Sequence, residues 1–350
     1  MKLIIQIPCF NEEMTLPAVI RDLPRQVPGV DEVEYLVVDD GSSDRTVEIA
    51  RRLGVHHIHC LGENRGLAAA FLAGINYCVE SGADIIVNTD GDNQYDAAGI
   101  QDLIAPIIAG CKDIVVGTRP IGEIEHFSAT KKFLQRWGSC VVRRFSGTSV
   151  SDVTSGFRAY SAEAAMRLQV FNRYTYTLET LIQAGHMNLR VGHVPIHVNL
   201  KARESRLISS VPCYVWRSAA IILHSYMTYK PLRTFLLDAI PPLSLGGLLC
   251  LRFMYYRWLG DGAGHVQSLL LATILLILSF LMVVLGVLAD LISTNRRLIQ
   301  EAIFVQRKSI REGRRTARLG WDRTEESMVE STRTEFVAPN HPSRVSLISS

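Results

Sequence analysis

Short apolar runs alternate with longer amphipathic segments over the first ninety residues of the chain. Two β-branched runs, at 3–7 and 34–38, predict buried parallel strands, and two further runs predict strands at 57–60 and 85–89. Between them, apolar residues recur at helical spacing and predict helices at 12–23, 46–53 and 66–82. This alternation predicts an open α/β sheet with helices on both faces, in which ligands bind beyond the carboxyl ends of the strands.

The pattern changes after about residue 230, where leucine, isoleucine and valine dominate. The 24 residues from Val266 to Ala289 include no charged side chain. At about 1.5 Å per residue, a helix of this length exceeds the roughly 30 Å hydrocarbon thickness of a bilayer. We therefore expect a transmembrane helix at about 266–292.

A second apolar segment, at about 235–259, is a weaker candidate because charged residues lie near both of its ends. A glycine-rich turn would join the two helices as a hairpin. Residues preceding the hairpin have an amphipathic pattern that favours a helix lying on a bilayer, although an ordinary surface helix fits equally well. The chain is thus expected to comprise an α/β domain at 1–210, an interfacial helix at 211–230, the hairpin at 231–295 and a basic tail, disordered or a frayed helix, at 296–350.

The net charge of +3 is too small and too evenly spread to indicate nucleic-acid binding. Lysine and arginine instead gather beside the apolar segments, at 201–206, 230–233 and 296–315. That placement is typical of the cytoplasmic side of a membrane protein, although solvated helix ends are an alternative. Because the first strand leaves no room for a secretory signal, we expect a multi-pass membrane protein with a cytoplasmic α/β domain.

Acidic residues follow three of the predicted strands. Asp90 and Asp92 come directly after the fourth strand, while Glu12 and the pair Asp39 and Asp40 follow the first two. Acids after strands are commonly only solvated, but three such ends in one sheet favour a shared ligand site. Oxygen ligands of this kind suit Mg²⁺ or Mn²⁺ bound together with substrate phosphates.

Three motifs carry a family resemblance. The segments IPCFNE at 7–12, VVDDGSSD at 37–44 and NTDGDNQ at 88–94 occur in this order. Together they resemble family 2 glycosyltransferases of the GT-A fold, and in particular the branch of dolichyl-phosphate mannose synthases and bacterial polyprenyl-phosphate glucosyltransferases. The resemblance covers about residues 3–300. It implies a GT-A catalytic domain at 1–210, followed by the amphipathic helix and the transmembrane hairpin.

By this resemblance, a nucleotide-sugar would bind between the first motifs and the acidic pair. The residues implied are Pro8, Phe10, Glu12, Val38, Asp39, Asp40, Asp90 and Gly91. A structural turn cap is the alternative for Asp39. Asp92 would ligate the metal and Gln94 would complete its site.

The segment DVTSGFR at 152–158 matches a second motif of the same branch. With Asp90 and Asp92, Asp152 is implied as a catalytic residue. It would act either as a general base or as a positioning group. We favour positioning, because an acceptor phosphate is already mostly a dianion at neutral pH.

Basic residues are expected to hold phosphate groups. Arg119 follows another apolar strand and corresponds to a phosphate-binding arginine of the branch. Arg203 and Arg206 resemble a mobile loop over the phosphates, with a solvated charge run as the alternative. At the lipid-phosphate positions, where relatives have arginine and serine, this chain has Lys131 and Gln135.

The expected function is inverting transfer of one hexose or N-acetylhexosamine from a nucleotide-sugar to undecaprenyl or dolichyl phosphate at the cytoplasmic membrane face. We expect the nucleotide to be UDP. Transfer to another lipid or to a lipid-linked oligosaccharide is an alternative. A second alternative is a non-catalytic nucleotide-sugar-binding membrane module. The membrane helices also favour self-association, which leaves a homo-oligomer open.

Overall fold

The computed structural model describes residues 1–119, 150, 152–170, 176–199, 220, 224, 227–260 and 266–335, with side chains to residue 313. Lys131, Gln135, Arg203 and Arg206 lie outside the described residues, so their predicted roles stay predictions. The same holds for most of the expected interfacial helix and for the expected domain boundary at residue 210.

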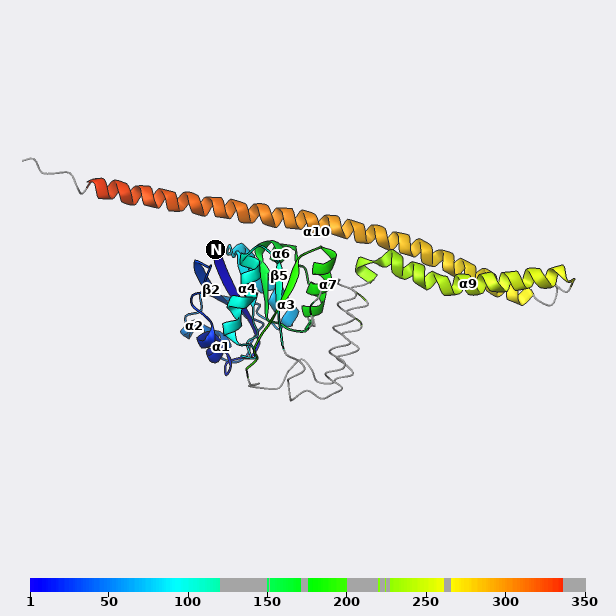
Figure 1. The fold of residues 1–350 in the computed structure, drawn as a ribbon, viewed down its shortest axis with the longest axis horizontal. Helices are drawn as coiled ribbons and strands as arrows, with labels where there is room; N and C mark the ends of the chain where they lie inside the picture. The colour runs from blue at the N-terminus through cyan, green and yellow to red at the C-terminus, as the bar shows by residue number, and fades with distance from the viewer. Residues whose placement is uncertain are drawn as a thin grey trace, which may run out of the picture.

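A seven-stranded mixed sheet forms the centre of the domain (Figure 1). In chain order its strands are β1 (Lys2–Cys9), β2 (Glu32–Asp39), β3 (His57–Cys60), β4 (Ile85–Asn88), β5 (Ile114–Thr118), β6 (Arg158–Ser161) and β7 (Val191–Pro195). Their spatial order is β3-β2-β1-β4-β6-β5-β7. The four strands predicted from apolar runs are confirmed, and they pair in parallel as expected.

Helices cover both faces of the sheet, as the alternating pattern predicted. They are α1 (Leu16–Asp22), α2 (Thr46–Arg52), α3 (Leu67–Glu80), the 3₁₀ turn η1 (Ala97–Gly99), α4 (Ile100–Ile108), α6 (Ala162–Arg167) and α7 (Thr177–His186). The first helix begins at Leu16 and not at residue 12, because the preceding residues form a turn in which Asn11 has a φ of 56°. Pro17 then occupies the first turn, where its missing N–H costs nothing.

Alternate residues of the central strands separate two apolar layers. Ile5 and Ile7 of β1 pack with α1 and α4. Ile4 of β1 and Val38 of the adjacent strand β2 pack with α3 and α6 on the other face. At Gly74, α3 lies so close to the sheet that a β-carbon would stand 2.3 Å from the Gln6 side-chain oxygen. The domain is therefore a three-layer sandwich in which the central strands are buried on both sides.

Strand β6 was not predicted, and it runs against its neighbours. It pairs antiparallel with both β4 and β5, and Arg158 at its start lies opposite Asn88 at the end of β4. An antiparallel strand begins where its neighbour ends. The segment that leads into β6 is consequently delivered to the carboxyl edge of the sheet.

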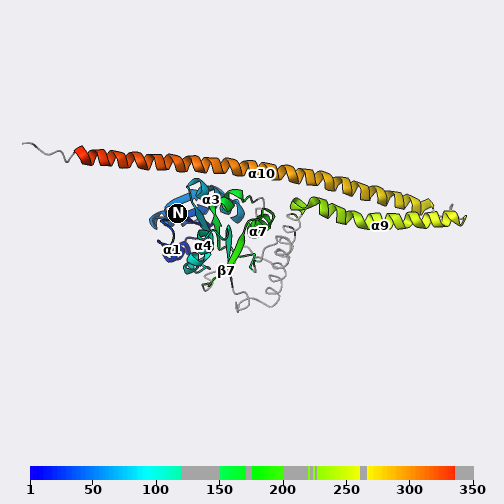
Figure 2. The same cartoon turned by 45° about the horizontal axis from the view of Figure 1, so that its top comes forward.

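Two long helices, α9 (Pro231–Trp258) and α10 (Val266–Glu335), follow the domain and run side by side (Figures 1 and 2). Gly246 and Gly286 permit close packing, and the Ser279 hydroxyl of α10 donates a hydrogen bond to the Ala239 carbonyl oxygen at 3.0 Å. Both helices are long and apolar enough to cross a membrane. The most apolar stretch is only 11% buried in α9 and 17% buried in α10, so neither helix resembles the core helix of a soluble domain.

For the segment 296–350 we expected either a disordered tail or a frayed helix, and the structure has a helix there as far as Glu335. This helix is the continuation of α10 beyond its apolar part, and it returns across the domain, over α6 (Figure 1). Arg307 donates to the Met166 carbonyl oxygen at 3.2 Å, and Arg311 pairs with Asp84 at 2.8 Å. These contacts give the charged part of the helix a docking surface, which composition alone does not reveal.

Phe304 is the apolar anchor of this docking. Its side chain is only 6% exposed, and the Arg167 guanidinium lies 3.7 Å from its ring centroid. Cation–aromatic stacking and burial of a full ring both favour the docked helix. The domain is thereby held against the extension of the second candidate span.

Replacing Phe304 with alanine should loosen this contact. We expect Phe304→Ala to destabilise the docked state by about 3 kcal/mol, the usual cost of emptying a buried phenylalanine site. The expected observation is a lower melting temperature together with faster tryptic cleavage at Arg307 and Arg311. Val305→Ala is the matched control, since Val305 is 57% exposed. Equal behaviour of the two variants would contradict the docking.

Candidate active site

The acidic pair lies at the point where the strand order reverses. Asp90 and Asp92 follow β4, which is the neighbour of β1. Between them, Gly91 faces the end of β1 so closely that a β-carbon would stand 3.2 Å from the Cys9 sulfur and 3.3 Å from a Glu12 carbon. The first and third motifs therefore meet at the switch point of the sheet, which is where sheets of this class have their ligand-binding crevice.

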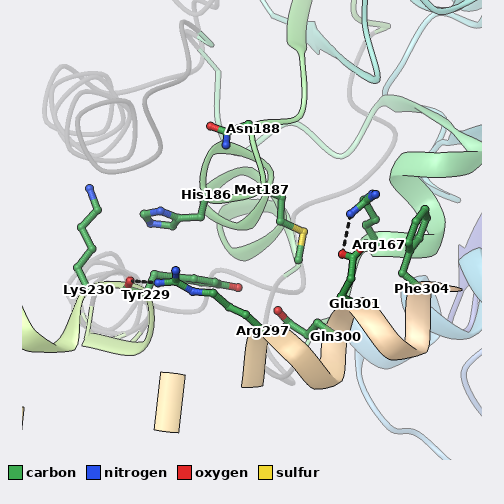
Figure 3. A pocket seen from close by; sticks show the side chains of 10 residues that line it. All are labelled: Arg167, His186, Met187, Asn188, Tyr229, Lys230, Arg297, Gln300, Glu301 and Phe304. Atoms are coloured by element: carbon green, nitrogen blue, oxygen red, sulfur yellow. Dashed lines mark hydrogen bonds and ion pairs between the residues drawn. The ribbon is translucent and has the colours of Figure 1, made fainter. Parts of the chain in front are cut away.

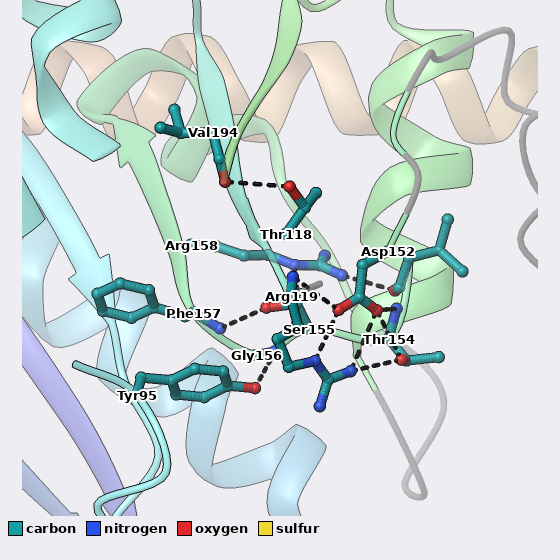
Figure 4. Close-up of polar contacts among 11 residues, drawn as sticks. Tyr95, Thr118, Arg119, Asp152, Thr154, Ser155, Gly156, Phe157, Arg158 and Val194 are labelled. Atoms are coloured by element: carbon teal, nitrogen blue, oxygen red, sulfur yellow. Dashed lines mark hydrogen bonds and ion pairs between the residues drawn. The ribbon is translucent and has the colours of Figure 1, made fainter. Parts of the chain in front are cut away.

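Asp90 rests on Gly156 of the 152–158 motif. A β-carbon at Gly156 would stand 2.8 and 2.9 Å from the two Asp90 carboxylate oxygens. The Gly156 N–H donates to the Tyr95 hydroxyl at 3.0 Å, and Tyr95 is itself buried (Figure 4). Burial, and next the negative charge of Asp92, raise the pKa of Asp90 to about 7. A bound cation would offset the repulsion between the two carboxylates.

A buried amide network supports this contact from below. The Asn88 side-chain nitrogen donates to the Gly156 carbonyl oxygen at 2.8 Å and to the Tyr176 hydroxyl at 2.9 Å. Its oxygen accepts from the Gln6 amide at 2.8 Å. None of the residues Asn88, Gly156 and Tyr95 was predicted to belong to the site. A polar residue closing an otherwise apolar strand was the available signal for Asn88.

Arg119 and Asp152 form a buried ion pair on the other side of the motif (Figure 4). Nε of Arg119 donates to one carboxylate oxygen at 2.7 Å and Nη2 to the other at 3.1 Å. Thr154 joins the pair, because its hydroxyl accepts from Nη2 of Arg119 and donates to Asp152, both at 2.9 Å. Among the described residues, none accepts from Nη1 of Arg119.

Asp152 is fully buried, yet the balance of its surroundings favours the carboxylate. Burial by itself would raise the pKa, but the charge and hydrogen bonds of Arg119 outweigh it and hold the pKa of Asp152 below its usual value. Both oxygens are occupied by donors. A carboxylate in this state orients a guanidinium better than it accepts a proton.

Arg158, the last residue of the motif, is structural. Its side chain is fully buried and donates to the carbonyl oxygens of Val153 and Ser155 at 2.9 and 2.8 Å. A third bond reaches the Thr180 hydroxyl of α7 at 2.8 Å. Arg158 therefore ties the loop that holds Asp152 to the strand and the helix behind it.

The acids after β2 are partly engaged by the main chain. Asp40 accepts from the N–H groups of Arg65 and Gly66 at 2.8 and 2.9 Å and thereby fixes the loop before α3. Both Asp39 oxygens face the Ser42 N–H, at 3.2 and 3.3 Å. The turn-cap interpretation of Asp39 thus has a physical basis, and the predicted nucleotide contacts of both residues stay predictions.

The remaining predicted nucleotide residues surround the same crevice. Pro8 pairs with Val38 in the sheet, and both are buried. Phe10, just past β1, is 37% exposed, and Glu12 is buried, accepting from the Thr15 hydroxyl at 2.7 Å. The geometry brings these residues within one site but leaves their individual roles as predictions.

Negative charge converges on this crevice. Burial, followed by the carboxylates of Glu12 and Asp39, raises the pKa of the Cys9 thiol well above its usual value. The thiol is therefore protonated and unreactive at neutral pH. An acidic crevice of this kind attracts cations and would repel a free diphosphate.

The oxygen-bearing side chains of this site suit a hard cation that takes only some of its ligands from the protein and the others from a substrate. Within the described part of the chain, no group of three or more His, Cys, Asp or Glu side chains could hold a metal ion by itself. Asp92 is half-buried, and its oxygen accepts from the Gln94 N–H at 3.2 Å. A cation at Asp92 and Gln94 would need further oxygen ligands, which phosphate groups supply in sites of this type.

This mixed sheet, with acids at its switch point and a second motif folded against them, has the GT-A architecture of a glycosyltransferase. The chain belongs to glycosyl transferase family 2: the model of that family matches residues 4–169. An N-acetylglucosaminyltransferase of Methanococcus voltae that is named for UDP-N-acetylglucosamine and dolichyl phosphate is 32% identical over 211 residues, which are 54% of this chain and 82% of the relative.

Two further likenesses agree. An undecaprenyl-phosphate mannosyltransferase of Micrococcus luteus is 27% identical over 60% of this chain and 89% of the relative. Among solved structures, glucosyl-3-phosphoglycerate synthase from Mycobacterium tuberculosis, in complex with Mn²⁺, UDP-glucose and phosphoglyceric acid, has a TM-score of 0.52. It is 20% identical and covers 64% of this chain and 79% of its own, so this likeness supports the fold alone.

The contact between Gly156 and Asp90 can be tested with a single methyl group. We expect Gly156→Ala to displace the Asp90 carboxylate and to slow donor turnover by about a hundredfold, because small displacements in a catalytic site are costly. Gly99→Ala is the control, since its β-carbon would meet nothing nearer than 3.5 Å. Steady-state turnover of a nucleotide-sugar measures the effect. Full activity of Gly156→Ala would show that Asp90 is not held there.

Proposed function

We propose that this glycosyltransferase moves one hexose or N-acetylhexosamine, with inversion, from a UDP-sugar to a polyprenyl phosphate at the cytoplasmic face of a membrane. The observation that carries the proposal is the meeting of the acidic pair with the Arg119–Asp152 pair, on either side of one motif. One pair suits a donor diphosphate with its cation and the other suits an acceptor phosphate.

Arg119 would hold the acceptor phosphate. Two of its three guanidinium nitrogens are oriented by Asp152 and Thr154, and its side chain is 10% exposed. A guanidinium fixed in this way loses little freedom when it binds a phosphate. Asp152 would serve as the positioning residue, in line with its full occupation by donors.

Donor binding would fall to the crevice between β1 and β4. The Asp90 and Asp92 carboxylates would face the diphosphate through a shared cation, with Gln94 beside them. Mg²⁺ or Mn²⁺ bound there would stabilise the negative charge of the departing nucleoside diphosphate. The chain's own residues would align the anomeric carbon with the phosphate oxygen that attacks it.

The acceptor class is supported by the relatives and by the two apolar helices. The names of the similar proteins mention undecaprenyl phosphate and dolichyl phosphate. Helix α9 leaves the domain and α10 returns to it, so both ends of the hairpin lie on the domain's side. Lysine and arginine at residues 230, 233, 296 and 297 support our proposal that this side is cytoplasmic.

An acceptor panel tests the proposal directly. Membranes containing the protein would be incubated with single labelled nucleotide-sugars and with undecaprenyl phosphate, dolichyl phosphate, diacylglycerol or a lipid-linked oligosaccharide. We expect one sugar to appear on a polyprenyl phosphate, identified by product mass. Product on diacylglycerol or on the oligosaccharide alone would favour the alternative acceptor. Binding of the nucleotide-sugar without any product would favour the non-catalytic module.

A substitution of Asp92 tests whether this residue is a ligand of the metal ion. Asp92→Asn should lower transfer at least about a hundredfold and abolish its dependence on added Mn²⁺, because a cation ligand is lost. Asp96→Asn is the matched control: Asp96 lies four residues away and accepts from the Ala98 N–H at 2.9 Å, a cap that asparagine preserves. Near-normal transfer by Asp92→Asn would remove Asp92 from the site.

A double-mutant cycle separates positioning from proton abstraction by Asp152. If Asp152 acts through Arg119, then Arg119→Gln, Asp152→Asn and the double variant should all lower kcat by a similar factor, on the order of a hundred. If the losses of the two single variants instead multiply in the double variant, Asp152 acts independently of Arg119, as a general base would. The surface pair Asp113 and Arg190, joined at 2.7 Å at the opposite edge of the sheet, provides a control cycle without effect on kcat.

A further inference from the structure

A cavity lies where the domain meets the two long helices (Figure 3). Its volume is about 470 Å³, within the range of small-ligand sites. The walls come from the ends of α6 and α7, the residues just before α9 and the charged part of α10. Because α7 ends and β7 begins here, the cavity borders the amino edge of the sheet, whereas the acidic pair lies at the carboxyl edge.

The walls carry an excess of positive charge. Three cationic side chains, Arg167, Lys230 and Arg297, face one carboxylate, Glu301. Glu301 is paired with Arg167 at 3.1 Å, so that pair is largely neutral. Within the described residues, neither Lys230 nor Arg297 forms an ion pair with an acid. Arg297 makes one hydrogen bond, to the Tyr229 carbonyl oxygen at 3.3 Å, which leaves most of its donors for a ligand.

His186 is a second, independent indication that a ligand binds in the cavity. Its ring stacks on Tyr229 with centroids 4.6 Å apart, and its buried Nε2 has no hydrogen-bond partner among the described residues. Burial, then the charges of Lys230 and Arg297, lower the pKa of His186 to about 4. The imidazole is therefore neutral and can donate a hydrogen bond to an acceptor in the cavity.

The position of the cavity indicates where such an acceptor would come from. Lys230 directly precedes the first candidate span, and Arg297 follows the apolar part of the second. The Ser293 hydroxyl donates to the Thr228 carbonyl oxygen at 3.0 Å, which places these two helix ends side by side. Basic pockets at such junctions suit the head groups of anionic lipids.

We propose that this cavity is a non-catalytic binding site for a phosphate-bearing anion, held by Lys230, Arg297 and His186. The negative charge would lie between the two cations, and His186 would donate to a phosphate oxygen. An anionic phospholipid of the inner leaflet is the source favoured by position, a preference that rests on the proposed membrane orientation. A soluble phosphate has the same chemistry and is tested alongside.

Binding would also strengthen the connection between the domain and the membrane. The cavity is closed on one side by the docked part of α10 and on the other by the start of α9. A phosphate that neutralises Lys230 and Arg297 would relieve their repulsion exactly where the two helices and α7 converge. The site would thus hold the domain at a fixed position beside the bilayer without touching donor or acceptor.

The test uses the full-length protein in detergent and native mass spectrometry with dioleoylphosphatidylglycerol or the zwitterionic dioleoylphosphatidylcholine. We expect the wild type to retain phosphatidylglycerol in preference to phosphatidylcholine. The variant Lys230→Gln/Arg297→Gln should lose this preference by on the order of tenfold or more, as two charge-assisted bonds are removed. Arg233→Gln, an exposed arginine one turn along α9 that does not line the cavity, is the matched control and should behave as wild type.

Calorimetric titration with inorganic phosphate forms the second arm. Saturable phosphate binding that the double variant lacks, without a lipid preference, would assign the site to a soluble anion. In either supported case, the pKa of His186, followed by NMR, should rise on binding in the wild type and not in the double variant. Equal lipid retention by all variants together with equal phosphate binding would overturn the proposal.

Two controls keep this result separate from the proposed function. Nucleotide-sugar binding by the double variant reports whether the domain is folded, since Lys230 and Arg297 lie outside the acidic crevice. The acceptor panel reports sugar transfer with no reference to this cavity. Loss of the lipid preference with donor binding intact supports the site, whatever acceptor the enzyme uses.

Discussion

The antiparallel pairing of Asn88 with Arg158 is the constraint on which the catalytic arrangement depends. It places the start of β6 beside the end of β4, so the loop before β6 lies against the loop after β4. Gly156 then has no room for a side chain, because the Asp90 carboxylate occupies that space. The fully buried Arg158 and the amide of Asn88 stabilise this junction with hydrogen bonds to the same loop.

The buried charges near this junction serve geometry more than stability. Removing two ions from water is expensive, and their attraction often does no more than offset that cost. Arg119 and Asp152 satisfy each other through two direct side-chain hydrogen bonds and through Thr154. Such a pair has few alternative arrangements. The result is a guanidinium held in one orientation at the edge of the site, where a phosphate would have to be positioned.

Helix α10 joins two environments in one rigid element. Its first part is apolar, mostly exposed and a candidate membrane span, and its later part packs on α6 through Phe304 and several arginines. Because α10 is one continuous helix, docking of its later part on α6 fixes the position of the domain relative to the apolar part of the same helix. The charged cavity lies where the apolar part of α10 gives way to its docked part, and there the proposed phosphate would bind beside Lys230 and Arg297.

Local patterns in the sequence determined the strands at the centre of the sheet, the acids at their ends and the two apolar helices. They could do so because side-chain periodicity and apolar length directly record which residues avoid water. Only the tertiary structure decided that β6 runs antiparallel, that Asp90 rests on Gly156, that Asp152 is occupied by Arg119 and that Asp40 is engaged by the loop before α3. These contacts join residues about 25 to 70 positions apart along the chain, and local periodicity carries no information about such partners. The docked part of α10 has the same origin: its charged composition resembles a solvated tail until α6 and Asp84 provide a surface for it.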